Sequence, residues 1–170
     1  MKKVSILFSI LFLFCSSFST QASIAAQSKR DNKVSVLFVQ TAPSAKIKSM
    51  GETNKFLKIT LDKVNSKVIY FSNRPKRVYG KLEAEKFTVM WESYFKKNPP
   101  NVAIQTSYQT RGDKMKEFTL IGTLTNPVYD SKAHSMTYTI QLEKGQQVTR
   151  HQLGQTTLFF DDVPFNPGGF

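Results

Sequence analysis

Short runs of β-branched and aromatic residues recur along the chain. The clearest is Met136–Leu142, in which apolar and polar residues alternate as they do in a strand with one buried face. Six similar runs are bounded by polar or turn-forming residues, at 34–39, 56–61, 67–72, 102–108, 118–124 and 156–160. This series predicts a mainly β fold, an antiparallel β-sandwich of about seven to eight strands.

One segment has the period of a helix instead. Over residues 82–97, apolar side chains recur at spacings of three and four, at Ala84, Phe87, Met90, Trp91, Tyr94 and Phe95. Glu92 and Lys96 are spaced to form an ion pair on the opposite face. Pro99 and Pro100 follow, and proline cannot continue a helix. We therefore expect one inserted amphipathic helix, over about 82–97, whose aromatic face docks on the sheet.

Turn-forming residues separate the predicted strands. Arg111-Gly112-Asp113 lies between two of them, as the loop of a hairpin would. Asn73-Arg74-Pro75 ends another strand, and Asn126-Pro127 and Asp130-Ser131 bracket a bend. Residues 164–170 hold two prolines and two glycines, which predicts an irregular tail.

The N-terminus has the three parts of a secretory signal. Lys2 and Lys3 precede the apolar run Val4–Cys15, and small and polar residues follow it. The run is about a dozen residues long, well short of the roughly 20 that span a bilayer. We expect residues 1–22 to be a cleavable signal peptide, with Ala22 before the cut and a cut after Ala25 as the alternative.

The expected cleavage defines the rest of the chain. Residues 23–33 are small and polar and predict a flexible lead-in to a single β-rich domain over 34–163. The expected location is secreted or periplasmic. Cys15 is the only cysteine, so the mature chain would have neither a disulfide nor a thiolate metal site. Such an exported domain must be stabilised by the burial of its core.

The chain is strongly basic. It has 24 Lys and Arg against 12 Asp and Glu, a net charge of +12, and the positive residues are dispersed. Loss of Lys2 and Lys3 would lower the net charge to about +10. This charge favours an anionic partner, such as lipid headgroups or acidic polysaccharide, and makes peripheral membrane contact possible. No motif for specific nucleic-acid binding is present, and a cationic surface without any specific partner is the alternative.

Catalytic motifs are missing from the sequence. His134 and His151 are the only histidines, too few for a metal site without cysteine. There is no nucleophile elbow, P-loop or dinucleotide fingerprint. Asp161 and Asp162 are adjacent, so on a strand they would face opposite sides. We predict no metal and no cofactor, and favour a binding protein over a secreted hydrolase with an unrecognised active site.

Arg111-Gly112-Asp113 also spells the tripeptide that integrins recognise. On the exposed hairpin of a secreted protein it would make the chain an adhesive module. Because Gly-Asp is also ordinary turn chemistry, the structural interpretation stands beside the adhesive one.

The stretch 68–80 is the most distinctive in the chain. It joins an aromatic strand to the turn Asn73-Arg74-Pro75-Lys76-Arg77, and the following helical segment holds Phe87 and Trp91. With 98–101, 127–130 and 158–161, it resembles a family of small exported bacterial proteins, mostly of unassigned function. That family usually has Asp where this chain has Asn73. The resemblance implies a secreted single domain, and one that fits a substrate of a Gram-negative secretion pathway, a possible host-interaction or virulence factor.

The same turn supplies the predicted binding site. A turn that holds two guanidinium groups next to a proline is suited to bind a carboxylate or phosphate bidentately. The predicted site residues are Asn73, Arg74, Arg77, Tyr79 and Trp91. The alternative is structural: Arg74 or Arg77 caps carbonyl groups or pairs with Glu83 or Asp161. The anionic partner would be a component of a host or bacterial surface.

Overall fold

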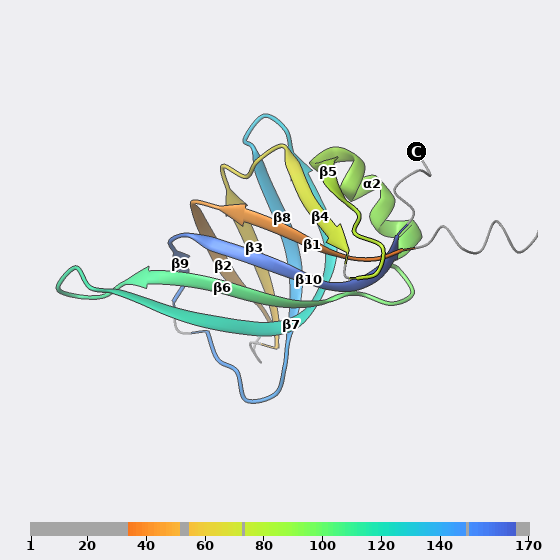
Figure 1. Ribbon diagram of the computed structural model, residues 1–170. Helices are drawn as coiled ribbons and strands as arrows, with labels where there is room; N and C mark the ends of the chain where they lie inside the picture. The colour runs from red at the N-terminus through yellow and green to blue at the C-terminus, as the bar shows by residue number, and fades with distance from the viewer. Residues whose placement is uncertain (1–33, 52–54, 73, 149, 166–170) are drawn as a thin grey trace, which may run out of the picture. The chain divides into compact units, whose positions relative to one another are not determined.

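The strand-forming segments pair into one antiparallel sheet in the computed structural model of the chain (Figure 1). The structure describes residues 34–51, 55–72, 74–148 and 150–165, and these fall in one compact unit. The elements are β1 (Val34–Ala42), β2 (Ser44–Met50), β3 (Phe56–Asp62), β4 (Lys67–Ser72), β5 (Tyr79–Glu83), α2 (Ala84–Tyr94), β6 (Asn101–Gln109), β7 (Met115–Asp130), β8 (Ser135–Leu142), β9 (Gln152–Leu153) and β10 (Thr156–Phe165). The predicted signal peptide, 1–22, and lead-in, 23–33, lie outside the described residues.

Within the described residues, the mainly β class with one helix is confirmed, but the strands form a single sheet where a two-sheet sandwich was expected. The strand order is β5-β4-β1-β10-β6-β7-β8-β3-β2-β9. Three of these ten strands, β2, β5 and β9, were not predicted. In β2 only Ala45 and Ile47 are buried, between exposed lysines. Its apolar signal is therefore weak, and pairing with β3 and β9 determines its conformation.

The long strand β7 turns one half of the sheet into the other. Met115–Thr123 of β7 pair with β6, and Gly122–Asp130 pair with β8. The register slips between Thr125 and Val128, and Asn126 has a φ of 50°. Such a bulge bends a strand. The predicted bend at Asn126-Pro127 is therefore a bend within a strand, and it brings the two halves of the sheet round one core (Figure 1).

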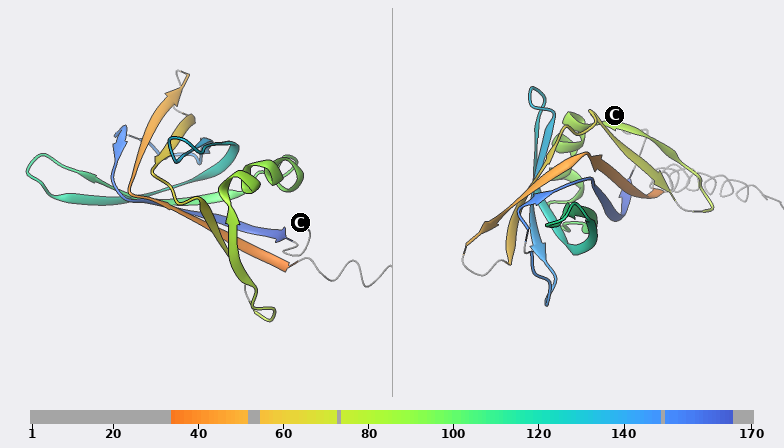
Figure 2. Two further views of the ribbon diagram at one scale, coloured as in Figure 1. Left: turned by 90° about the horizontal axis from the view of Figure 1, so that it is seen from above. Right: turned by 90° about the vertical axis from the view of Figure 1, so that its left-hand side faces the viewer.

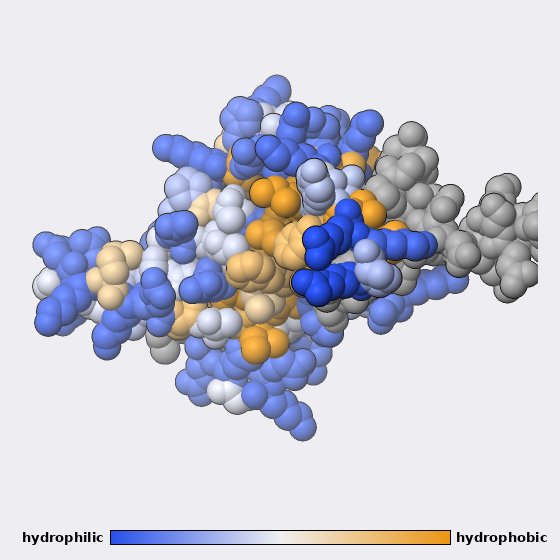
Figure 3. Space-filling view, in the orientation of Figure 1, coloured by the Kyte–Doolittle hydropathy of each residue, from blue (hydrophilic) through white to orange (hydrophobic). Residues whose placement is uncertain are grey.

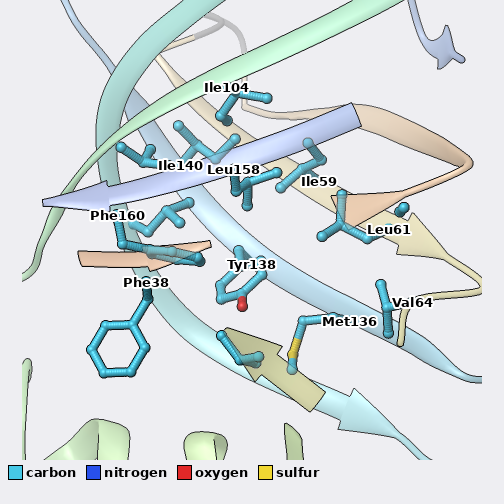
Figure 4. Close-up of a cluster of buried hydrophobic side chains, with 14 of the residues drawn as sticks. Phe38, Ile59, Leu61, Val64, Ile104, Met136, Tyr138, Ile140, Leu158 and Phe160 are labelled. Carbon is cyan, nitrogen blue, oxygen red and sulfur yellow. The ribbon is translucent and has the colours of Figure 1, made fainter. Parts of the chain in front are cut away.

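The core lies between these two halves. Phe38 on β1, Phe160 on β10 and Tyr138 on β8 are almost fully buried, and the Tyr138 and Phe160 ring centroids are 5.8 Å apart. Figure 4 shows Ile59, Ile140 and Leu158 in the same cluster. The face of the sheet that carries these side chains is called the inner face below.

The helix α2 contributes the aromatic end of the core. Phe87, Trp91 and Phe95 are buried as predicted, and the Phe87 ring centroid lies 5.3 Å from that of Phe38 and 5.8 Å from that of Phe160. Burying an aromatic side chain of this size contributes about 1.5–3 kcal/mol. The expected Glu92–Lys96 pair is present at 2.7 Å, and this hydrogen bond raises the pKa of Lys96.

Two predicted boundaries are wrong. The helix is shorter than 82–97, because residues 82 and 83 belong to β5, where Leu82 lies opposite Val68. Residues 82 and 83 pair with β4, and this pairing overrides the helical period at the N-terminal end of the predicted helix. Residues 164 and 165, predicted as the start of an irregular tail, belong to β10, and residues 166–170 lie outside the described part. Among the described residues, no helix combines the length and apolar character needed to cross a bilayer.

Candidate binding face on the outer side of the sheet

The turn between β4 and β5 is held by one serine. The Ser72 backbone N–H donates to the Val78 carbonyl at 2.7 Å, and Ser72 Oγ accepts from the Val78 N–H at 2.8 Å. Ser72 Oγ also donates to the Lys76 carbonyl. The Arg74–Pro75 peptide bond is cis. The three hydrogen bonds of Ser72 join the two ends of the turn, and so fix the backbone on either side of Arg74 and Arg77.

Arg74 and Arg77 are exposed on this turn. Within the described part of the chain, neither arginine forms an ion pair. Glu83 is the partner that the structural alternative gives to these arginines, but its Oε1 lies 3.4 Å from Lys67 Nζ and forms an ion pair there. The side chain of Asp161 lies outside the described residues, as does Asn73. The interpretation of the arginines as an internal lock on the turn thus has no support from Glu83.

A shallow depression adjoins the turn. Its volume is about 350 Å³, and it is lined by Phe71, Ser72, Arg74, Arg77, Val78 and Tyr79. Tyr79 is 83% exposed and lies opposite Phe71 in the β4–β5 register. The structure therefore brings together Arg74, Arg77 and Tyr79 of the predicted site, around one open hollow.

Trp91 is not part of this group. Only 4% of its surface is exposed, and its ring centroid lies 4.4 Å from that of Phe95 and 5.6 Å from that of Phe87. It is a core residue of α2 and presents no surface to a ligand. The F…W spacing of the helix reflects packing on the inner face, which the period of three and four already indicated.

Sequence reasoning missed an apolar row on the outer face, the face opposite the core. In the strand registers Ile69 lies opposite Val39, Val39 opposite Phe159, Phe159 opposite Ala103, and Ala103 opposite Ile121. These five residues, on β4, β1, β10, β6 and β7, are named here the outer apolar row. Ile69, Phe159 and Ile121 are 47%, 39% and 48% exposed. Each belongs to a run that alternates or is continuously apolar, and only the strand order shows that they align.

The outer apolar row continues toward the arginine turn. Phe71 and Leu37 are paired two residues along from Ile69 and Val39, on the same face, and Tyr79 lies opposite Phe71. Figure 3 shows apolar side chains gathered near the middle of this view, with strongly hydrophilic ones beside them. Lys81, opposite Ile69, is exposed at the end of the row. The face is therefore amphiphilic, with cations at one end of an apolar strip.

The β6–β7 hairpin carries the predicted adhesion tripeptide. Arg111, Gly112 and Asp113 are all exposed at its tip, and Gly112 and Asp113 have φ values of 99° and 59°. The Asp113 carboxylate accepts a hydrogen bond from Gln109 Nε2 at 2.7 Å. The hairpin loop is confirmed. Figure 2 shows its tip well apart from the β4–β5 hairpin, so the two candidate sites are separate.

The described residues hold no group of three or more metal-ligating side chains. His134 lies in the β7–β8 turn with a φ of 48°, and His151 Nδ1 lies 3.1 Å from the Ile47 carbonyl oxygen. Burial raises the pKa of Tyr138 well above its ordinary value, and its side chain lies in the core. Among the described residues, the arginine turn, the outer apolar row and the β6–β7 hairpin tip are exposed features that the core does not use.

Comparisons with protein-family models, with curated proteins and with solved structures found no match to this chain.

Proposed function

We propose that this chain is a secreted, non-enzymatic binding protein for an anionic partner at a host or bacterial surface, with Arg74, Arg77 and Tyr79 in contact with that partner. The observation that carries the proposal is the pair of exposed arginines on a clamped turn, without acidic partners in the described part of the chain. Guanidinium groups that are not engaged internally are available for bidentate contacts to carboxylate, sulfate or phosphate.

The net charge of the chain supports the same proposal. The full chain has a net charge of +12, and about +10 would remain after loss of the predicted signal peptide. Such a charge attracts anionic surfaces and raises the rate of encounter with them. The arginine turn would then supply the short-range contacts. Export through the predicted signal peptide would bring the protein to such a surface, where it would act as a host-interaction factor.

The test is retention on immobilised heparin, a soluble polyanion. The Arg74→Ala/Arg77→Ala variant is compared with Lys86→Ala/Lys97→Ala, which removes the same charge from exposed positions on and just after the helix. Losing charge-assisted hydrogen bonds worth about 1.5–3 kcal/mol each should weaken binding at least about tenfold in the arginine variant. The lysine variant should change only slightly.

Salt dependence completes the test. Wild-type retention should fall steeply between low and physiological ionic strength, because exposed charges are screened. Equal losses in the two double variants would mean that overall charge, and not the turn, binds the polyanion. Retention on heparin that does not change with salt concentration would contradict the proposal.

A second candidate function is adhesion through Arg111-Gly112-Asp113, which the exposed, projecting hairpin tip favours. Asp113→Glu keeps the charge but lengthens the side chain, and should abolish cell attachment to surfaces coated with the protein. Gln109→Ala is the matched control, because it removes only the hydrogen bond to Asp113. Attachment that survives Asp113→Glu would remove this candidate.

A further inference from the structure

The outer apolar row is unusual for the open face of an antiparallel sheet. When one face of such a sheet packs on the core, the other normally carries polar residues. Here one register line across five neighbouring strands places only apolar residues on the outer face, namely Ile69, Val39, Phe159, Ala103 and Ile121. With strands about 4.8 Å apart, the row is roughly 19 Å long. A contiguous apolar strip of this kind on a soluble domain marks a surface that binds something.

Aromatic residues lie between the strip and the arginine turn. Phe71 is 42% exposed, and Tyr79, which lies opposite it, is 83% exposed. An aromatic ring with a polar end, such as tyrosine, prefers the boundary between hydrocarbon and water. The order across the face is thus apolar strip, aromatic pair and cationic turn.

We propose that this face binds the surface of an anionic phospholipid bilayer, with Ile69, Phe159 and Ile121 entering the boundary of the acyl chains. Arg74, Arg77 and Lys81 would contact lipid phosphates at the end of the row. The inference rests on the proposed function, because it names the anionic partner of the same arginine turn. Basic side chains next to inserted apolar ones are the combination that holds peripheral proteins on acidic membranes.

Charge complementarity selects this occupant over two others. A soluble acidic polysaccharide would satisfy the arginines but would leave the apolar row in water. A second copy of the chain would cover the row but would bring together two surfaces of a protein with a net charge of +12. A bilayer rich in acidic lipid satisfies both the cations and the apolar side chains.

The experiment uses vesicles of phosphatidylcholine with about 30% phosphatidylglycerol, and vesicles of phosphatidylcholine alone. Co-sedimentation is measured for wild type, Arg74→Ala/Arg77→Ala, and Ile69→Thr/Ile121→Thr/Phe159→Thr. Threonine keeps a high strand propensity, so the triple variant should retain the fold. A matched control, Ser35→Thr/Gln105→Thr/Thr119→Ala, changes exposed outer-face positions on β1, β6 and β7 away from the row.

The wild-type protein should co-sediment with the acidic vesicles and should not co-sediment with vesicles of phosphatidylcholine alone. The threonine variant should lose at least about tenfold in vesicle binding while keeping its retention on heparin. The arginine variant should lose both. A threonine variant that sediments with acidic vesicles as well as wild type does would overturn the bilayer inference and leave the proposed function intact. Absence of heparin binding in wild type would instead overturn the proposed function.

A fluorescent reporter gives a measurement that does not depend on a triple variant. Trp91 is the only tryptophan and is buried, so a Phe159→Trp substitution places a second, exposed indole in the middle of the row. Its emission should shift to shorter wavelength with acidic vesicles and be quenched by lipids brominated near the headgroup. An emission spectrum that acidic vesicles leave unchanged would contradict insertion of the row.

Discussion

The Tyr138 hydroxyl donates a hydrogen bond to Gln40 Oε1 at 2.7 Å, and it does so inside the apolar core, between β8 and β1. The pair joins the two halves of the bent sheet. Gln40 Nε2 is buried as well, and has no hydrogen-bond partner among the described residues. The pair therefore combines a satisfied bond with a polar atom whose burial costs free energy.

Tyr138→Phe should lower the free energy of unfolding by about 1–3 kcal/mol, because it leaves Gln40 Oε1 buried without a donor. Gln40→Leu should cost a similar amount by leaving the hydroxyl unpaired. The double variant leaves neither Gln40 Oε1 nor the Tyr138 hydroxyl buried without its partner, so it should lose less than the two single losses together. Urea denaturation followed by circular dichroism measures all three. Strict additivity would show that the bond has no coupling energy.

Stability should fall at alkaline pH because of the same tyrosine. Burial raises the pKa of Tyr138 well above 10.0, whereas in the unfolded chain it ionises near that value. The unfolded state therefore releases a proton first, and the contribution present below about pH 10 is lost as the pH rises above it. Thermal melts across this range should show a shallower decline for Tyr138→Phe than for wild type. Tyr79→Phe, at an exposed tyrosine, is the control and should decline like wild type.

The aromatic face of α2 should account for much of the stability. Phe87→Ala should lower the free energy of unfolding by about 3–5 kcal/mol, because the ring is fully buried against Phe38 and Phe160 and the cavity it leaves cannot be filled. Val89→Ala lies on the same helix but is 74% exposed, and should change stability by no more than about 0.5 kcal/mol. Both substitutions raise helix propensity, so similar losses in the two variants would contradict the assignment of the Phe87 loss to its packing in the core.

Gly122 should not tolerate a side chain. It lies where β7 passes from pairing with β6 to pairing with β8, and a Cβ atom there would stand 2.4 Å from the backbone oxygen of Gln141. Because backbone atoms of a paired strand cannot move aside cheaply, Gly122→Ala should cost at least about 1–3 kcal/mol. Thr123→Ala, the next residue on β7, adds no atom and should cost less. The comparison uses the midpoints of chemical denaturation.

Local pattern accounts well for the elements whose period is strong. Met136–Leu142 alternates apolar and polar residues and is buried at alternate positions in β8. The helical period correctly identified Phe87, Trp91 and Phe95 as core residues. The short strand β9, of two residues, and the edge strand β5, which contains Gly80, have no comparable signal. Their conformation depends on partners that are distant in sequence.

The same distinction, between short-range pattern and long-range pairing, applies to the candidate site. Arg74, Arg77 and Tyr79 are close in sequence, so a turn rich in basic residues could be recognised without a structure. Trp91 was assigned to the site because it is near in sequence, yet it faces the core. The outer apolar row could not be predicted, because its five residues come from five strands and are aligned only by the register of the sheet.

By itself, the sequence determined the class of the fold, the aromatic face of its helix and the positive charge of its surface, because these depend on residue type and short-range period. The tertiary structure alone decided that the strands form one bent sheet, that Tyr138 meets Gln40 in its core, and that an apolar strip adjoins the arginine turn. The physical reason is that hydrogen-bond register between strands is a long-range property, settled only when the whole core is packed.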